Sequence, residues 1–237
     1  MSAKTLLLFD IDGTLVHSNK IDSQCFAHIY QTIYERPFPS IDWRVYPHVT
    51  DHTIFGTVIR DQFQREAEPQ EIQHFQDQFV ALLQQKRQRQ PQDFMEVPGA
   101  KRIIARLLGE ADFTVGIATG GWERPARLKL QHVGIPEHQL VLSGADEQIR
   151  REDILQKAID ATRAQHPHLE RIVYLGDASW DVRTTRNMGL DFIGIRRAGD
   201  LEVLHELGAQ VVIQDFLDYP TVLRAVAEAR VPDAPRR

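Results

Sequence analysis

Two carboxylates separated by one residue follow an apolar run near the start of this 237-residue chain. The apolar run is Leu6 to Phe9, and Asp10-Ile-Asp-Gly-Thr14 comes directly after it. In an extended chain, residues two apart point the same way, so Asp10 and Asp12 can face one small space. Two like charges this close cost free energy unless a cation or a bound proton relieves them. The pair therefore suggests chemistry, with an ordinary strand end and turn as the alternative.

The two residues after the carboxylates suit a binding loop. Gly13 would let the backbone turn sharply and leave an amide close to a ligand. Thr14 adds a hydroxyl at the same place. The apolar run before them is typical of a strand buried on both faces of a parallel sheet.

Short apolar runs and helical patterns alternate through the second part of the chain. Strands are expected at residues 113–118, 140–143, 171–175, 192–195 and 211–213, and helices at 123–133, 151–165, after Asp181, at 200–207 and at 222–229, with a further helix opened by Pro98-Gly99. Such alternation predicts right-handed crossovers and a doubly wound, Rossmann-like parallel sheet covered on both faces.

Residues 16–92 have a different pattern. Apolar residues recur at helical spacing over residues 20 to about 35, and further helices are expected from Thr50 and after Pro69. Proline residues break the chain between these helices and again at Pro91. We therefore expect an α/β core formed by residues 1–15 and 93–237, with residues 16–92 as an all-helical insertion.

Polar residues follow several of the predicted strands, where ligands bind in parallel sheets. They are Thr119-Gly120-Gly121, the pair Arg150 and Arg151, and Gly176-Asp177 with Asp181. Each alone could be a turn, a solvated helix start or a helix cap. Because they occur at equivalent positions, together with Asp10 and Asp12, we expect them to form one site.

The composition limits the class of protein. Asp and Glu number 33 against 28 Lys and Arg, and no long basic run occurs, which argues against a nucleic-acid polymer as partner. The single cysteine, Cys25, excludes an internal disulfide framework and favours a reducing compartment. No apolar stretch is long enough to cross a bilayer or serve as a signal peptide. These features predict a cytoplasmic protein without a membrane partner, as a monomer or homodimer.

The ordered motifs resemble those of the haloacid dehalogenase-like hydrolase superfamily, which consists mostly of phosphatases. The matching segments are Asp10-Ile-Asp-Gly-Thr14, Thr119, a basic residue near 151, and Gly176-Asp177 with Asp181. The helical stretch 16–92 lies where this superfamily inserts a helical cap. Two phrases, Ala118-Thr-Gly-Gly-Trp122 and Leu175-Gly-Asp-Ala-Ser-Trp-Asp181, are similar to those of a phosphatase-type branch.

The resemblance implies a role for each matching residue. Asp10 would attack phosphorus and form an aspartyl phosphate, and a carboxylate needs no base for this. Asp12 would protonate the leaving oxygen and then take a proton from the hydrolytic water. Mg²⁺ would be held by Asp10, the Asp12 carbonyl and Asp177, with Asp181 as ligand or support. Gly13, Thr14, Thr119, Gly120 and Arg151 would bind the phosphate.

One departure from the superfamily concerns its third motif, which usually has a lysine and often a proline after it. No such lysine is present here. Arg151 is the predicted replacement because Ile154, Leu155 and Ala158 then fall at suitable helical spacing, with Arg150 as the second choice. Arginine can bind phosphate in a bidentate manner.

The resemblance predicts a Mg²⁺-dependent phosphatase acting on a small phosphorylated metabolite, such as phosphoglycolate, a sugar phosphate or a nucleotide monophosphate. Residues near Asn19 and in Tyr46–Asp51 are expected to select the substrate by closing over the site, although a turn before a helix also explains the second segment. The alternatives are a phosphomutase, a haloacid dehalogenase, which Asp12 disfavours, and a phosphate-binding regulator without turnover.

Overall fold

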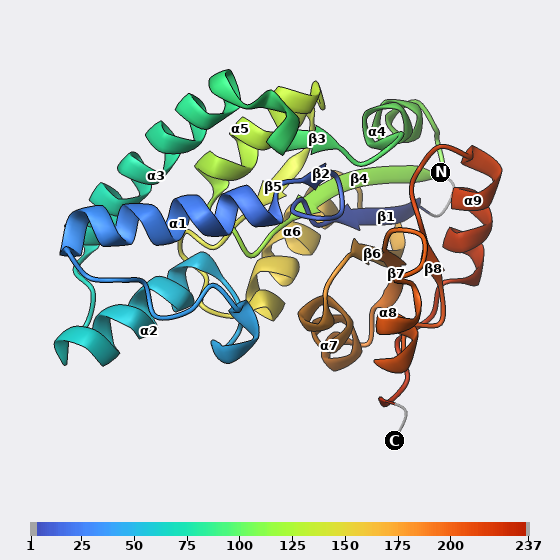
Figure 1. Ribbon diagram of the computed structural model, residues 1–237. Helices are drawn as coiled ribbons and strands as arrows, with labels where there is room; N and C mark the ends of the chain where they lie inside the picture. The colour runs from blue at the N-terminus through green and yellow to red at the C-terminus, as the bar shows by residue number, and fades with distance from the viewer. Residues whose placement is uncertain (1–3, 236–237) are drawn as a thin grey trace.

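A computed structural model describes residues 4–235 of the chain (Figure 1). The first three and last two residues of the predicted core therefore lie outside the described part. The strands are β1 (Lys4–Phe9), β2 (Val16–His17), β3 (Met95–Glu96), β4 (Phe113–Ala118), β5 (Val141–Ser143), β6 (Leu169–Gly176), β7 (Asp191–Ile195) and β8 (Val212–Ile213). The helices are α1 (Asn19–Tyr34), α2 (Asp51–Phe63), α3 (Pro69–Arg89), α4 (Ala100–Leu108), α5 (Glu123–Val133), α6 (Arg151–Gln165), α7 (Ser179–Met188), α8 (Glu202–Glu206) and α9 (Tyr219–Glu228). Short 3₁₀ turns lie at Trp43–Val45, Pro91–Phe94 and Glu137–Gln139.

The main sheet has the order β5-β4-β1-β6-β7-β8, and its neighbouring strands run parallel. β1 lies inside it, with Leu7 opposite Val115 of β4 and Val173 of β6. Leu6 to Phe9 are fully buried, which explains why that run is apolar without alternation. The predicted α/β doubly wound sheet is confirmed. Its carboxyl edge brings the ends of β1, β4, β5 and β6 together.

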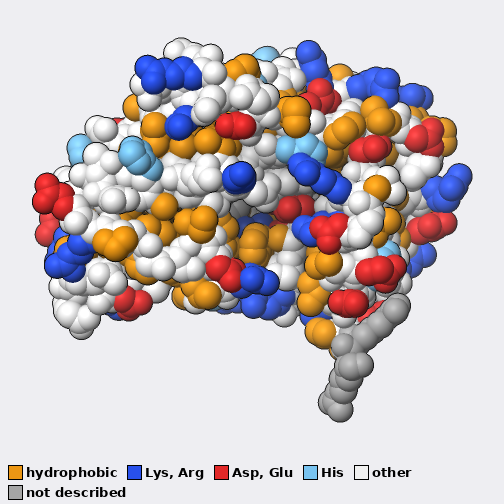
Figure 2. Space-filling view, in the orientation of Figure 1, with side chains coloured by type: hydrophobic (Ala, Val, Ile, Leu, Met, Phe, Trp, Pro, Cys, Tyr) orange, Lys and Arg blue, Asp and Glu red, His pale blue; other side chains and the backbone are white. Residues whose placement is uncertain are grey.

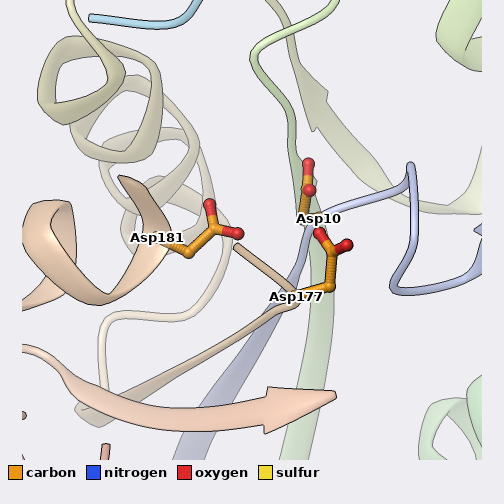
Figure 3. Close-up of side chains that lie close together, drawn as sticks. All are labelled: Asp10, Asp177 and Asp181. Atoms are coloured by element: carbon orange, nitrogen blue, oxygen red, sulfur yellow. The ribbon is translucent and has the colours of Figure 1, made fainter. Parts of the chain in front are cut away.

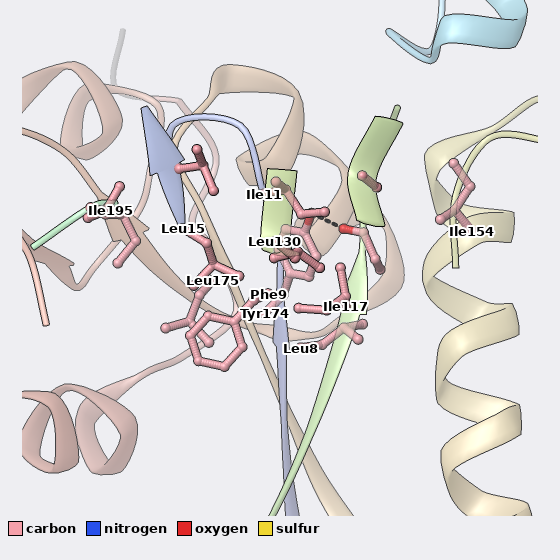
Figure 4. Packing of buried hydrophobic residues seen from close by; sticks show 14 of the residues in the cluster. Leu8, Phe9, Ile11, Leu15, Ile117, Leu130, Ile154, Tyr174, Leu175 and Ile195 are labelled. Atoms are coloured by element: carbon pink, nitrogen blue, oxygen red, sulfur yellow. Dashed lines mark hydrogen bonds between the residues drawn. The ribbon is translucent and has the colours of Figure 1, made fainter. Parts of the chain in front are cut away.

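Helices cover both faces of this sheet (Figure 1). α4, α5 and α9 lie on one side, and α6, α7 and α8 lie on the other. Buried side chains of β1, β4 and β6 form the centre of the core, among them Phe9, Ile117 and Leu175 (Figure 4). Because packed interiors resist displacement, this core holds the ends of the strands at fixed positions.

The helices α1, α2 and α3 form a separate group beside the carboxyl edge of the sheet (Figure 1). Phe26 of α1 lies at the centre of an aromatic cluster and stacks on Trp122 of the core, with ring centroids 5.8 Å apart and planes 14° apart. Phe75 and Phe79 of α3 contact the same Phe26 ring. The helical group is thus attached to the core through aromatic packing.

The sequence analysis expected residues 16–92 to be all-helical, but the structure shows that they are not. Val16–His17 form β2, which pairs antiparallel with Met95–Glu96 of β3. A two-stranded ribbon therefore joins the helical group to the core on both crossings of the chain. A strand of two residues is too short to show the alternation of apolar and polar side chains by which strands are predicted from sequence.

Several element boundaries agree with the sequence pattern. α5 and α6 span the predicted residues, and the Thr50 side chain caps α2 by accepting a hydrogen bond from the Thr53 N–H. α7 begins at Ser179, whereas the sequence analysis expected this helix after Asp181. Within residues 4–235, none of the helices has both the length and the apolar content that crossing a membrane requires.

Candidate active site

Three carboxylates converge at the carboxyl edge of the sheet (Figure 3). Asp10 follows β1, Asp177 follows β6, and Asp181 lies in the first turn of α7. One oxygen of each lies within 4.8 Å of the others, and all three residues are buried. Separate segments of the chain therefore bring three acidic groups to one point, as the sequence analysis expected.

Burial makes ionisation of these carboxylates less favourable. It raises the pKa of Asp10 to about 7; the nearby Asp181 carboxylate also raises this pKa, and the Arg151 guanidinium lowers it. Burial also raises the pKa of Asp177, and the Asp181 and Asp10 carboxylates raise it further. Adjacent buried carboxylates repel one another unless a cation is added. The cluster is therefore suited to a divalent cation.

The oxygens of Asp177 are available for such a cation. Among residues 4–235, Oδ1 is buried without a hydrogen-bond partner, and Oδ2 accepts a 3.4 Å contact from the Asn19 amide. Gly13 leaves room for this carboxylate, because a Cβ there would lie 2.0 Å from Oδ2. Gly13 also has a φ of +83°, which other residues rarely adopt. Oxygen ligands of this kind are those that Mg²⁺ prefers, so the residues fit this ion.

Asp181 differs from Asp177 because both of its oxygens have partners. Oδ1 accepts a 2.6 Å hydrogen bond from Arg151 Nη2, and Oδ2 accepts one of 3.0 Å from the Ala178 N–H. The side chain thus fixes a guanidinium and closes the first turn of α7. These contacts fit a supporting role better than a ligand role.

Arg151 occupies the position at which the sequence analysis expected a basic residue. Its side chain is 5% exposed, with Nη2 3.9 Å from Asp10 Oδ1. Burial opposes its charged form, but the Asp181 and Asp10 carboxylates outweigh this and raise the pKa of Arg151. Its Nε has no hydrogen-bond partner within the described part of the chain and can donate to a ligand. Arg150, by contrast, is 54% exposed and pairs with Glu152, so the geometry favours Arg151.

The loop after β4 brings small residues and a hydroxyl to the same pocket. Thr119 is buried, and its Oγ1 accepts a hydrogen bond from the Gly121 N–H. A Cβ on Gly120 would lie 2.2 Å from Arg151 Nη1, so only glycine lets the guanidinium approach. Thr14 is buried after β1, and its Oγ1 has no hydrogen-bond partner among the residues that the structure describes. Every residue that the sequence analysis assigned to phosphate binding therefore lies at this edge.

Asp12 has a neighbour that the sequence analysis missed. Lys129 of α5 donates to both carboxylate oxygens, at 2.7 and 2.8 Å, and also pairs with Asp22 of α1. A signal for it existed: Lys129 falls in the apolar stripe of α5 with Ala126, Leu130 and Val133, where a lysine is unusual.

The helical group supplies one wall of the pocket. The pocket has about 500 Å³ of space, part of it open to solvent, and Figure 2 shows a hollow in the surface between the helical group and the core. Its wall from residues 19–54 consists of Asn19, Asp22, Trp43, Val49, Asp51 and Ile54. Asn19 and part of the segment Tyr46–Asp51, the two places expected to select the substrate, therefore line the pocket.

The segment before α2 contacts catalytic candidates directly. Val49 has a φ of +47°, an outlier for a β-branched residue, and its carbonyl accepts a 3.2 Å hydrogen bond from Arg151. The Asp51 N–H donates to the Gly120 carbonyl at 2.8 Å, and its carboxylate accepts from the Trp122 N–H at 3.0 Å. The strained turn thus joins the helical group to the loop after β4.

This sheet, with a nucleophile candidate after β1 and acidic residues after β6, is the arrangement of a phosphatase-type hydrolase. The profile of the haloacid dehalogenase-like hydrolases matches residues 7–195, and the chain belongs to this family. The resemblance recognised in the sequence is thereby confirmed, and the protein is an enzyme of the family's phosphatase type.

Individual relatives agree with this assignment. The chain is 24% identical over 187 residues to the pyrophosphatase PpaX of Halalkalibacterium halodurans, covering 78% of this chain and 80% of that protein. Its fold is similar to that of a hydrolase from Pseudomonas syringae, with a TM-score of 0.67, 17% identity, and coverage of 95% and 99% of the two chains. CbbY from Rhodobacter sphaeroides, whose structure is a complex with phosphate, gives a TM-score of 0.66 at 17% identity, with coverage of 92% and 96%.

Proposed function

We propose that this enzyme is a Mg²⁺-dependent phosphatase that hydrolyses a small phosphate monoester through an aspartyl phosphate on Asp10. The observation that carries the proposal is the position of Asp10. It lines one pocket with Arg151, Thr119 and Gly120, and its carboxylate lies beside that of Asp177. A carboxylate nucleophile, a cation site and phosphate-binding donors are the components that phosphoryl transfer needs.

In the first half of the reaction, an Asp10 oxygen attacks phosphorus while the bond from phosphorus to the leaving oxygen breaks. The Asp12 carboxyl donates its proton to that oxygen, which departs as an alcohol. Arg151 and the Thr119 hydroxyl hold the phosphoryl oxygens, and Asp181 keeps the guanidinium of Arg151 in place. The products of this half are the Asp10 acyl phosphate and a free alcohol.

In the second half, the Asp12 carboxylate removes a proton from a water molecule, whose oxygen attacks the phosphorus. The bond between phosphorus and Asp10 breaks, and inorganic phosphate leaves. Asp10 returns to its carboxylate form, and Asp12 again carries a proton. The enzyme thus returns to its initial state, and the net reaction converts the ester and water to an alcohol and inorganic phosphate.

Asp10, the Asp12 carbonyl and Asp177 would hold the Mg²⁺ ion, with Asp181 in a supporting role. When bound, the ion supplies positive charge that offsets the repulsion between the nucleophile and the phosphate. The buried, unpartnered Oδ1 of Asp177 supports this assignment. The chain's own residues bind and orient the ester and transfer the protons.

We also propose that residues 16–92 form a cap, with the core made of residues 1–15 and 93–237. The cap would close over the pocket, exclude water and restrict the substrate to a small metabolite. The wall of the pocket that residues 19–54 provide supports this division.

A panel of phosphate esters tests the proposal. The purified protein would be incubated with Mg²⁺ and phosphoglycolate, glycerol 3-phosphate, glucose 6-phosphate, ribose 5-phosphate, AMP and 4-nitrophenyl phosphate, and phosphate release measured. We expect at least one ester to be hydrolysed with multiple turnovers. Asp10→Asn should lower kcat by about 10³-fold or more, because the nucleophile is lost. Absence of phosphate release from every ester, by a folded protein with Mg²⁺, would contradict the proposal.

A further inference from the structure

Lys129 is a buried cation that phosphate binding does not use. It lies in the second turn of α5, and its side chain is 2% exposed. Burial opposes the charged form of the side chain, but the Asp12 and Asp22 carboxylates outweigh it and raise the pKa of Lys129. The side chain is therefore an ammonium ion held among carboxylates.

The contacts of Lys129 are with carboxylates. Nζ donates hydrogen bonds to both oxygens of Asp12 and forms an ion pair with Oδ1 of Asp22. The ammonium group is therefore directed at these two acidic residues. Lys129 therefore does not replace the lysine that the third motif lacks, a position that Arg151 already occupies.

These contacts leave Asp12 with little freedom to rotate. Oδ1 accepts from Lys129 and from the Ser18 hydroxyl, and Oδ2 accepts from Lys129. A carboxyl held at both oxygens stays in one orientation, whereas one on a turn after Ile11 would otherwise rotate about its side-chain bonds. Proton transfer needs a donor within hydrogen-bond reach of the reacting oxygen, so orientation limits its rate.

The same ammonium group also connects the core with the helical group. Asp12 and Lys129 belong to the core, while Asp22 lies in the first turn of α1. The Lys129 side chain is thus fixed by a residue whose position depends on the helical group. If α1 moves away from the core, Lys129 loses one of its two carboxylate partners.

We propose that Lys129 is a positioning residue: it orients the Asp12 carboxyl for proton transfer, and Asp22 makes this orientation depend on the placement of α1 over the site. The inference rests on the proposed function, because it assigns the proton transfers to Asp12. It predicts that Lys129 affects esters according to their need for a proton on the leaving oxygen.

Leaving groups of different basicity test this inference. An alkoxide leaves with difficulty unless it is protonated, whereas 4-nitrophenolate leaves readily without a proton. The quantity to compare is kcat/KM, which reports the steps up to departure of the leaving group, so later hydrolysis of the acyl phosphate does not contribute. The substrates are 4-nitrophenyl phosphate and the alkyl ester that the panel above hydrolyses fastest.

Lys129→Met should lower kcat/KM for the alkyl ester by about 10–100-fold and for 4-nitrophenyl phosphate by less than about 3-fold. Asp22→Asn should lower the alkyl value by about 3–10-fold in the same selective manner, and Lys129→Arg should restore part of it. The surface variant Lys157→Met is the matched control and should leave both values unchanged, since that side chain is 45% exposed.

Lys129→Met leaves two buried carboxylates without their cation, so the double variant Lys129→Met/Asp22→Asn is measured beside it, with circular dichroism to verify folding. Equal losses on both esters would overturn the inference, because a merely structural role predicts them. Unchanged kcat/KM in the folded variants would also overturn it. Neither result would touch the proposed function, which fails only if the unaltered enzyme hydrolyses no ester.

Discussion

At the scale of single residues, the basic group of the site is Arg151, and the neighbouring residues accommodate its guanidinium group. Arg151 contacts Asp181, the Tyr174 hydroxyl and the Val49 carbonyl, and it approaches Asp10. Gly120 leaves the space that the guanidinium needs. A lysine would supply one charged point in place of this planar group and could not make the same set of contacts.

The first prediction compares the two neighbouring arginines. Arg151→Ala should lower kcat by at least about 10²-fold, because one charge that faces the reacting phosphate is lost. It should also lower the free energy of unfolding by about 3 kcal/mol, since Asp181 is left buried without its partner. Steady-state kinetics and urea denaturation measure the two effects.

Arg150→Ala is the control, because its side chain is exposed and pairs only with Glu152. We expect kcat to stay within about 2-fold and the free energy of unfolding within about 0.5 kcal/mol of the unaltered enzyme. A large loss of kcat in Arg150→Ala, with little in Arg151→Ala, would reverse the assignment.

At the scale of elements, helix ends connect the site to the rest of the chain. α5 begins just after the loop Thr119–Gly121 and carries Lys129 in its second turn, so one rigid element holds two parts of the pocket. α3 of the helical group packs against α5. The start of α3 is fixed by Glu71, which accepts hydrogen bonds from the Tyr34 hydroxyl, the Glu68 N–H and Arg65.

The second prediction concerns the charge of Glu71. Its hydrogen bonds with Arg65 lower the pKa of Glu71 to about 2. Because the folded value is depressed, the stabilisation from ionised Glu71 is complete above about pH 4.3, the ordinary value in an unfolded chain. It is lost as the pH falls toward 2.

Glu71→Gln should therefore lower the free energy of unfolding by about 0.5–1 kcal/mol at pH 7, a modest value because Arg65 is 44% exposed. The difference from the unaltered protein should be the same at pH 5 and smaller at pH 3.5. Urea denaturation at the three pH values measures it. A difference that grows in acid would show that the sign of the pKa shift is wrong.

At the scale of the whole molecule, folding gathers acidic groups that repel one another. Asp10 follows β1, Asp177 follows β6 and Asp181 lies in α7, and the sheet holds them together in spite of their charge. The sheet core supplies the free energy that this arrangement costs. A cation that binds the folded protein alone would recover part of that cost.

The third prediction is that Mg²⁺ stabilises the folded protein. Its concentration-dependent binding should raise the melting temperature, and at 100 times the dissociation constant the free energy of unfolding should rise by about 2.7 kcal/mol. Calorimetry at constant pH and ionic strength measures this in the absence of any substrate. Asp177→Asn should abolish most of the increase, because it removes a proposed ligand.

Glu147→Gln is a matched control, since this carboxylate is 79% exposed and lies outside the pocket. It should leave the Mg²⁺ effect intact. An equal increase in melting temperature for Asp177→Asn and the unaltered protein would place the ion elsewhere or make the effect non-specific.

The sequence determined those features that depend on local periodicity and chain order. The buried run Leu6–Phe9, the alternation of strands and helices, and the polar residues after each strand predicted the sheet and the edge at which Asp10, Thr119, Arg151 and Asp177 meet. The carboxyl ends of parallel strands lie at one edge of a sheet, so residues distant along the chain could be assigned to that edge without knowledge of their contacts.

Only the tertiary structure decided which side chains touch. Helical spacing favoured Arg151 over Arg150, but the contacts of Arg151 with Asp181 and of Arg150 with Glu152 appear only in the structure. The pairing of Lys129 with Asp12 and Asp22 joins three separate segments. The short ribbon of β2 and β3 likewise has too few residues to show a period. Such contacts arise from the packing of one element on another, and no spacing along the chain specifies that packing.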